Sequence, residues 1–125
     1  MNNALTEQLS ASRFRVAAAI AGINALVSTG FAIAALVTGP STIAWYAADR
    51  AAALAVAVLV VAALGSRAGL LAVGWTLTAV QAADAFVGLG TAEVTKVVGP
   101  AGLAIATGAA LVALGRQHVR SGATT

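Results

Sequence analysis

The stretch IAWYAADRAAALAVAVLVVAALGSRAGLLAVGWTLTAVQAADAFVGL, residues 43–89, decides the fold of this chain. It holds two long apolar segments, 43–64 and 68–89, separated only by Gly65-Ser66-Arg67. Each segment has about the 20 residues that a helix needs to cross the hydrocarbon layer of a bilayer. A link this short brings two helices together as an antiparallel pair. The stretch therefore predicts a transmembrane hairpin.

Two further apolar segments flank this hairpin, one at 14–37 and one at 94–114. The break between the first and second segments is Gly39-Pro40-Ser41-Thr42, a turn followed by a residue suited to an N-cap. The predicted fold class is therefore all-α, an antiparallel four-helix transmembrane bundle. We expect a membrane domain at 13–116, a polar N-terminal tail at 1–12 and a polar C-terminal tail at 117–125.

Pro100 lies early in the fourth segment and affects where its helix begins. A helix that started at Pro100 and ended near Gly115 would be only about 24 Å long at 1.5 Å per residue. Proline removes one backbone hydrogen bond, and membrane helices tolerate this when a neighbour supplies a partner. We therefore expect a helix that begins near Thr91 and is kinked at Gly99-Pro100.

The composition supports a membrane location. Of the residues, 60% are hydrophobic and 9% are charged, whereas a soluble domain carries about 25% charged residues. The surface must therefore meet a lipid bilayer, and no stretch shows the alternation of a membrane barrel strand. The chain has no cysteine, which excludes disulfides and thiolate metal sites. The sequence indicates no cofactor, no metal and no nucleic-acid partner, because its few basic residues flank apolar segments.

The basic residues also predict the orientation of the chain, since loops rich in Lys and Arg stay in the cytoplasm. Arg50 and Lys96 lie on one side of the expected bundle. The other side holds both termini and five arginines: Arg13, Arg15, Arg67, Arg116 and Arg120. We therefore expect a multi-pass protein of the cell membrane with both termini in the cytoplasm. Trp45 and Tyr46 would then lie at the outer interface as aromatic anchors.

Ionisable groups inside a bilayer are costly, so those within the apolar segments mark a candidate site. Asp49 and Arg50 lie near the start of the second segment, and Asp84 lies near the end of the third. Because these segments run in opposite directions, all three residues are expected at the same depth in the outer half. Gln81 and Thr78 share a helical face with Asp84 at one-turn spacing, so this face should point into the bundle.

The polar residues therefore predict a pocket in the outer half of the bundle, with Asn24 of the first segment just below it. If both carboxylates meet Arg50, one balances its charge and the other is left for acid–base work. The candidate catalytic residues are Asp49, Arg50 and Asp84. The candidate ligand-binding residues are Asn24, Gln81, Thr78, Trp75 and Tyr46.

A purely structural interpretation stays open at these positions. Arg50 can pair with one aspartate and fix the register of two helices, or extend to the interface and leave no pocket. Asn24 can be an interhelical hydrogen-bonding residue, and Trp75 can be part of the packing. Faces of small residues suit either close helix packing or a homodimer, namely Ala17, Ala21 and Ala25, and Ala104 and Gly108.

The resulting functional hypothesis is a pocket for a small lipophilic molecule. Chemistry in it would be cofactor-independent acid–base chemistry, such as epoxide opening, isomerisation or cyclisation. The alternative is a small transporter or an accessory or structural membrane subunit. Small multidrug pumps need a carboxylate in the middle of the first helix, where this chain has Asn24. The Asp-Arg-Asp set also resembles that of small epoxide hydrolases of the limonene-epoxide type, which are soluble and have a different fold.

The second half of the chain resembles a family of uncharacterised bacterial four-helix membrane proteins within the DoxX-like group. The residues that carry the resemblance are Ala48-Asp49-Arg50 in the second helix and Asp84-Ala85 late in the third. The family pattern often has a His before a Gly early in the fourth helix, where this chain has Val98-Gly99. The resemblance implies the four-helix fold and supports the pocket, and the family has no established activity to transfer.

Overall fold

The computed structural model describes residues 3–91 and 93–121, and the regular structure of this part of the chain is helical. The elements in order are α1 at Asn3–Thr38, α2 at Thr42–Ala63, α3 at Arg67–Gly88, the 3-10 helix η1 at Leu89–Thr91 and α4 at Val94–Ser121. Four helices of the described chain are long and apolar enough to cross a membrane. The predicted all-α four-helix fold is confirmed.

The ends of the central helices explain why the links are so short. Ser41 caps α2 by accepting a hydrogen bond from the Ala44 N–H at 3.1 Å, and Ser66 caps α3 in the same way with Gly69. At the end of α2, Gly65 has φ of 61° and its N–H donates to the Ala62 carbonyl. Such a positive φ favours glycine, because it costs an L side chain strain. Residues 64–66 therefore end one helix and begin the next.

Three helix boundaries differ from the sequence-based expectation. α1 begins at Asn3, because residues 3–12 contain neither proline nor glycine and continue the helix. α4 begins at Val94 rather than near Thr91, since η1 completes the end of α3 and the Thr91 Oγ1 donates to the Gly88 carbonyl at 2.8 Å. α4 extends through 117–121 of the expected C-terminal tail. Positions 1–2 and 122–125 of the expected tails lie outside the described residues.

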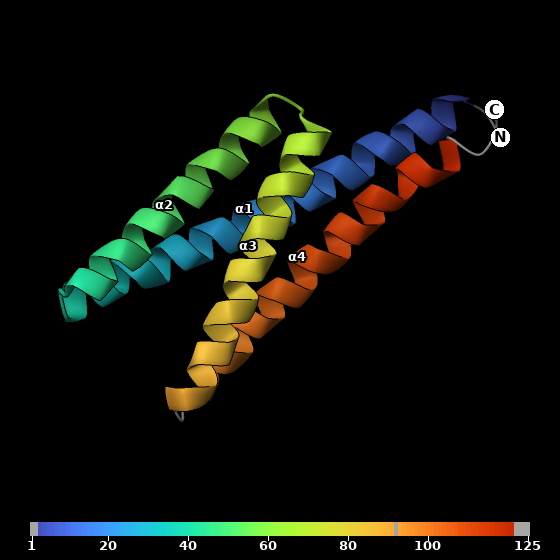
Figure 1. Cartoon of the computed structure of the whole chain (residues 1–125). Coiled ribbons are helices and arrows are strands. Elements are labelled where there is room, and N and C mark those ends of the chain that lie inside the picture. The colour runs from blue at the N-terminus through green and yellow to red at the C-terminus, as the bar shows by residue number, and fades with distance from the viewer. Residues whose placement is uncertain (1–2, 92, 122–125) are drawn as a thin grey trace.

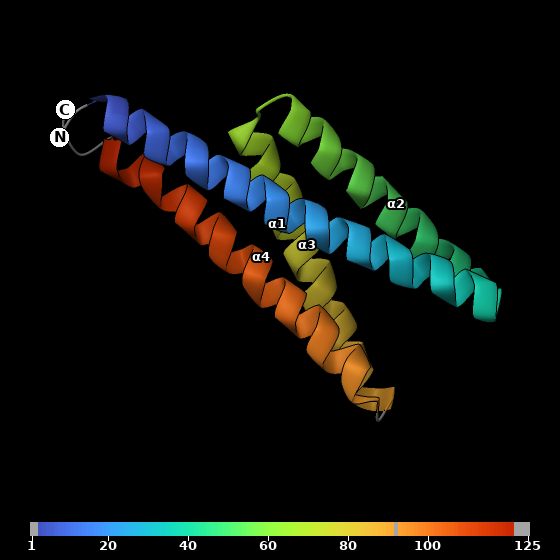
Figure 2. The ribbon, with the colours of Figure 1, turned by 180° about the vertical axis from the view of Figure 1, so that it is seen from behind.

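The four helices form two hairpins that diverge at one end (Figure 1). α1 packs most closely on α2, and α3 packs most closely on α4. The termini end of the bundle holds both chain termini and the α2–α3 link, and there the hairpins lie together. The opposite end, called the splayed end below, holds the α1–α2 and α3–α4 links, which lie far apart in both views (Figure 2). This divergence positions the candidate site.

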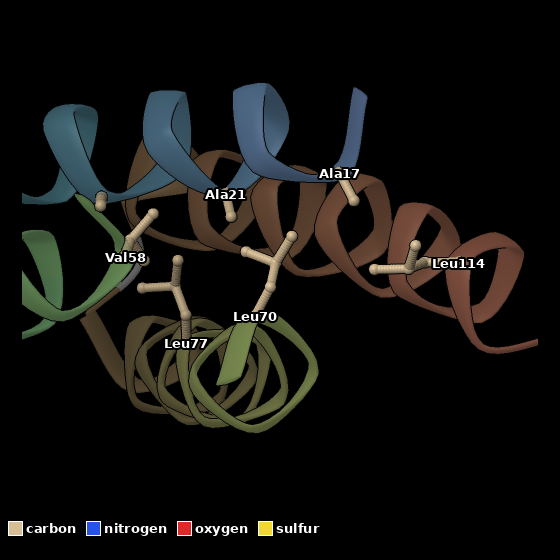
Figure 3. Close-up of a cluster of buried hydrophobic side chains, with 7 residues drawn as sticks. Ala17, Ala21, Val58, Leu70, Leu77 and Leu114 are labelled. Atoms are coloured by element: carbon tan, nitrogen blue, oxygen red, sulfur yellow. The ribbon is translucent and has the colours of Figure 1, made fainter. Parts of the chain in front are cut away.

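The core lies between the hairpins, toward the termini end. Leu70 and Leu77 of α3 point toward the alanine face of α1, and Val58 of α2 closes the cluster (Figure 3). The buried residues of this cluster are Ala17, Ala21, Ala25, Val58, Leu70, Leu77 and Leu114. Alanines let the α1 backbone approach leucines closely, which is how membrane helices gain packing energy. The Ala17/Ala21/Ala25 face considered for a homodimer is therefore used inside the bundle.

α3 and α4 lie in close contact at a glycine that meets a carbonyl group without its usual helical donor. Pro100 lies inside α4 and has no N–H, so it cannot donate to the Lys96 carbonyl one turn before it. Gly88 of α3 lies directly against this group. A Cβ at Gly88 would collide with the Lys96 oxygen and lie 2.8 Å from its carbonyl carbon. Gly88 therefore fixes the spacing of the α3–α4 hairpin at the splayed end.

The outer surface of the bundle is apolar on every helix. Large hydrophobic side chains that are exposed there include Ile23, Leu26, Val56, Leu59, Phe86, Val98 and Ile105. In water such a continuous apolar surface would drive aggregation, whereas in a bilayer it meets lipid of the same polarity. The arrangement is that of a small multi-pass membrane protein.

Candidate functional site

A cavity of about 910 Å³ lies between the two hairpins at the splayed end. All four helices contribute to its wall, which is mainly apolar and includes Val27, Phe31, Leu54, Val80 and Leu103. The polar lining residues are few, as in typical sites for small lipophilic ligands. They are Ser28, Arg50, Gln81, Asp84, Thr91, Glu93, Thr95 and Lys96.

An ion pair joins the hairpins in the wall of this cavity. One terminal nitrogen of Arg50 on α2 donates to both carboxylate oxygens of Asp84 on α3, each at 3.2 Å. The two side chains are 49% and 39% exposed, so the pair lies in the wall and not in the core. The topology explains the contact, because α2 and α3 run in opposite directions and bring these positions to the same depth.

Asp49 does not take part in this ion pair. Its side chain is exposed and does not line the cavity, and within the described residues it forms no ion pair. Consecutive helical residues project about 100° apart, so the rotation of α2 that turns Arg50 toward α3 turns Asp49 away. One carboxylate therefore meets Arg50, a point that the sequence alone leaves open.

Below the ion pair, a buried hydrogen-bond network connects α1, α3 and α4. Asn24 is completely buried, and its Nδ2 donates to the Thr107 Oγ1 at 2.8 Å and to the Leu103 carbonyl at 3.4 Å. Its Oδ1 accepts from the Gln81 Nε2 at 2.8 Å. Ser28 lies between the two amides, where its hydroxyl accepts from Gln81 and donates to the backbone carbonyl of Asn24. Asn24 and Gln81 therefore lie close together, as expected from the sequence.

The other candidate ligand-binding residues lie away from the cavity. The Thr78 hydroxyl donates to the Gly74 carbonyl of its own helix, and both Thr78 and Trp75 contact α4 beside Gly108. Tyr46 is 73% exposed and does not line the cavity. On this face of α3, Thr78 therefore packs against α4, and Gln81, one turn later, lines the cavity.

Ser28 and Thr107 are polar residues that the sequence places near the depth of Asn24 in their apolar helices, and in the structure they complete the buried network. At the cavity mouth Glu93 and Lys96 form an ion pair at 2.9 Å. From the sequence, these two residues are expected either at the outer lip of the pocket or in a solvated first turn. The sequence does not show which apolar residues form the cavity wall, because cavity-lining and lipid-facing positions use the same residue types.

No family model, no curated protein and no solved structure matches this chain. The resemblance to the DoxX-like group therefore stays a prediction. The features of this chain that point to a function are the cavity, the ion pair and the buried network.

Proposed function

We propose that this protein binds a small lipophilic molecule in the cavity between its hairpins. The observation that carries the proposal is the cavity itself, which is large, mostly apolar and flanked by a charged pair and a buried amide network. Apolar walls with a few placed polar groups are the common form of small-molecule sites. A merely structural bundle gains nothing from such a space, because helices in lipid are held together by close packing.

A photoreactive decyl diazirine in lipid nanodiscs tests this proposal. A probe that enters a defined cavity labels its lining residues in a saturable way, whereas labelling of lipid-facing residues rises in proportion to probe concentration. We expect saturable labelling of residues 27–35 and 77–88. Labelling that never saturates in these segments would overturn the proposal.

A matched pair of substitutions in α1 supplies the control. Ala35 lines the cavity, while Ala34 is exposed beside it and does not. Ala35→Trp fills part of the space and should abolish the saturable component. Ala34→Trp adds the same side chain to the outer surface and should leave it unchanged.

Chemistry in this cavity would depend on Asp84, which is the only aspartate of the predicted set in its wall. Arg50 positions the Asp84 carboxylate, which would act as the general base on a bound molecule. Epoxide opening, isomerisation and cyclisation are reactions that such a group can support without a cofactor. Once a substrate is identified, Asp84→Asn should abolish turnover and Asp49→Asn should not. Full turnover in Asp84→Asn would remove Asp84 from the mechanism.

The basic residues support an orientation with the termini end in the cytoplasm and the splayed end outside. The chain has no cysteine, so single cysteines can report the side directly. A membrane-impermeant maleimide applied to intact cells should label Gly39→Cys in the α1–α2 link and not Ser12→Cys in α1. The reverse pattern would invert the orientation.

A further inference from the structure

The hydrogen bonds of the buried network can be followed atom by atom. Asn24 uses both amide protons, one on the Thr107 Oγ1 and one on the Leu103 carbonyl. A backbone carbonyl can only accept, so Leu103 fixes which way the Asn24 amide faces. The Asn24 Oδ1 is then directed at Gln81, which must present its own amide nitrogen.

Gln81 is left with one atom unused. Its Nε2 donates one proton to the Asn24 Oδ1 at 2.8 Å and the other to the Ser28 Oγ. No residue that the structure describes donates to the Gln81 Oε1, although the side chain is only 4% exposed. Almost all buried polar atoms in native proteins have a partner, and an amide oxygen without one costs free energy.

The unused oxygen belongs to a residue that lines the cavity. Gln81 lies at the inner end, beside the core residue Leu77, and Asp84 lies about one turn closer to the splayed end. The charged donors of the wall have partners already, since Arg50 donates to Asp84 and Lys96 donates to Glu93. The inner end of the cavity therefore offers an acceptor and lacks a donor.

We propose that the ligand is a lipid-soluble alcohol whose hydroxyl group donates to the Gln81 Oε1. This inference rests on the proposed function, since it names the chemical class of the molecule in the same cavity. The hydroxyl group enters first and reaches Gln81 at the inner end. The hydrocarbon body lies along the apolar wall, against Val27, Val80 and Leu103.

Competition against the decyl diazirine in nanodiscs tests the assignment with three probes of equal chain length. Decanol can donate and accept, decyl methyl ether can only accept, and decane can do neither. In the wild type we expect decanol to compete about tenfold better than the ether, which corresponds to one hydrogen bond in a buried site. In Gln81→Met this ratio should fall to about one, because methionine keeps the side-chain length and removes the acceptor.

Thr78→Val is the matched control on the same helix. Thr78 lies one turn before Gln81, donates within its own helix and does not line the cavity. This variant should keep the tenfold preference for decanol. If Gln81→Met is not recovered folded, the ratio of decanol to ether in the wild type decides the question alone.

The outcomes separate the two proposals. Equal competition by decanol and ether in the wild type overturns the alcohol assignment and leaves the lipophilic cavity in place. A decanol preference that persists in folded Gln81→Met also overturns the assignment. Failure of all three probes to compete overturns the proposed function and the alcohol assignment with it.

Discussion

The termini end and the splayed end are built from the same kind of helix, yet only one of them is closed. At the termini end, leucines of α3 and α4 fill the space against the alanine face of α1. At the splayed end, each hairpin stays tight and the space between hairpins is open. An alanine face on one helix therefore gives close packing only where large side chains of another helix lie against it. Four predictions test this contrast, from the largest expected effect to the smallest.

Gly88→Ala should have the largest effect. The added methyl group would meet the Lys96 carbonyl, which is backbone and cannot turn aside. We expect the free energy of unfolding to fall by about 3 kcal/mol, as for other overpacked sites. Titration with SDS from mixed micelles, followed by circular dichroism, measures it. Gly22→Ala has open space around it and should leave stability unchanged or slightly raised. Equal effects of the two substitutions would show that α3 and α4 are not in close contact at Gly88.

A leucine-to-alanine pair on α4 compares the two ends directly. Leu114 is fully buried in the core, and Leu103, about three turns earlier, lines the cavity. Leu114→Ala should lower the free energy of unfolding by about 2 kcal/mol, the lower end of the range for core leucines, because the lost energy is packing and not transfer from water. Leu103→Ala should cost clearly less in the same titration. A larger loss for Leu103 would mean that the helices pack closely at the splayed end when the protein is in a membrane.

Asn24→Ala should have an intermediate effect. It removes the Thr107 hydrogen bond and leaves Gln81 with Ser28 alone. We expect a loss of about 1–2 kcal/mol in the free energy of unfolding. Thr76→Ala is the control, because that hydroxyl is exposed and bonds only to the Ala72 carbonyl of its own helix. A neutral Asn24→Ala would argue that the network is kept for binding and contributes nothing to stability.

The smallest expected effect is the coupling of Arg50 to Asp84. Both side chains are substantially exposed at the open end of the bundle, and where water reaches them there the pair should contribute only about 0.5 kcal/mol. A double-mutant cycle with Arg50→Gln and Asp84→Asn measures this coupling. The same cycle with Asp49→Asn should give no coupling, since Asp49 is turned away from Arg50. Strong coupling of Arg50 to Asp49 would show that both carboxylates meet the arginine after all.

The sequence predicts well how deep each residue lies in the bundle, but it predicts poorly how each helix is rotated about its own axis. The lengths of the apolar segments and the reversal at Gly65 place the helices, and antiparallel neighbours bring Arg50 and Asp84 to one level. Whether Asp49 or Arg50 faces α3 depends on the rotation of α2 about its axis. In a helix that is apolar on all sides, no polar face fixes that angle.

The cavity lies beyond sequence-based prediction for a related reason. In water, an apolar residue is expected inside, but in a membrane protein Phe31 and Leu103 can equally face lipid or a cavity. The contact of Gly88 with the Lys96 carbonyl has a partial signal, since Pro100 shows which carbonyl lacks its donor. The sequence does not show which helix lies against that carbonyl.

The length of α1 has a practical consequence for following these helices in a bilayer. Its first ten residues extend the helix by about 15 Å at 1.5 Å per residue, without proline or glycine between Asn3 and Ser12. A spin label at Thr6 would therefore move together with the whole of α1 as one rigid body. Its distance to a second label at Arg116 of α4 would report the angle between the hairpins, read from outside the hydrocarbon layer.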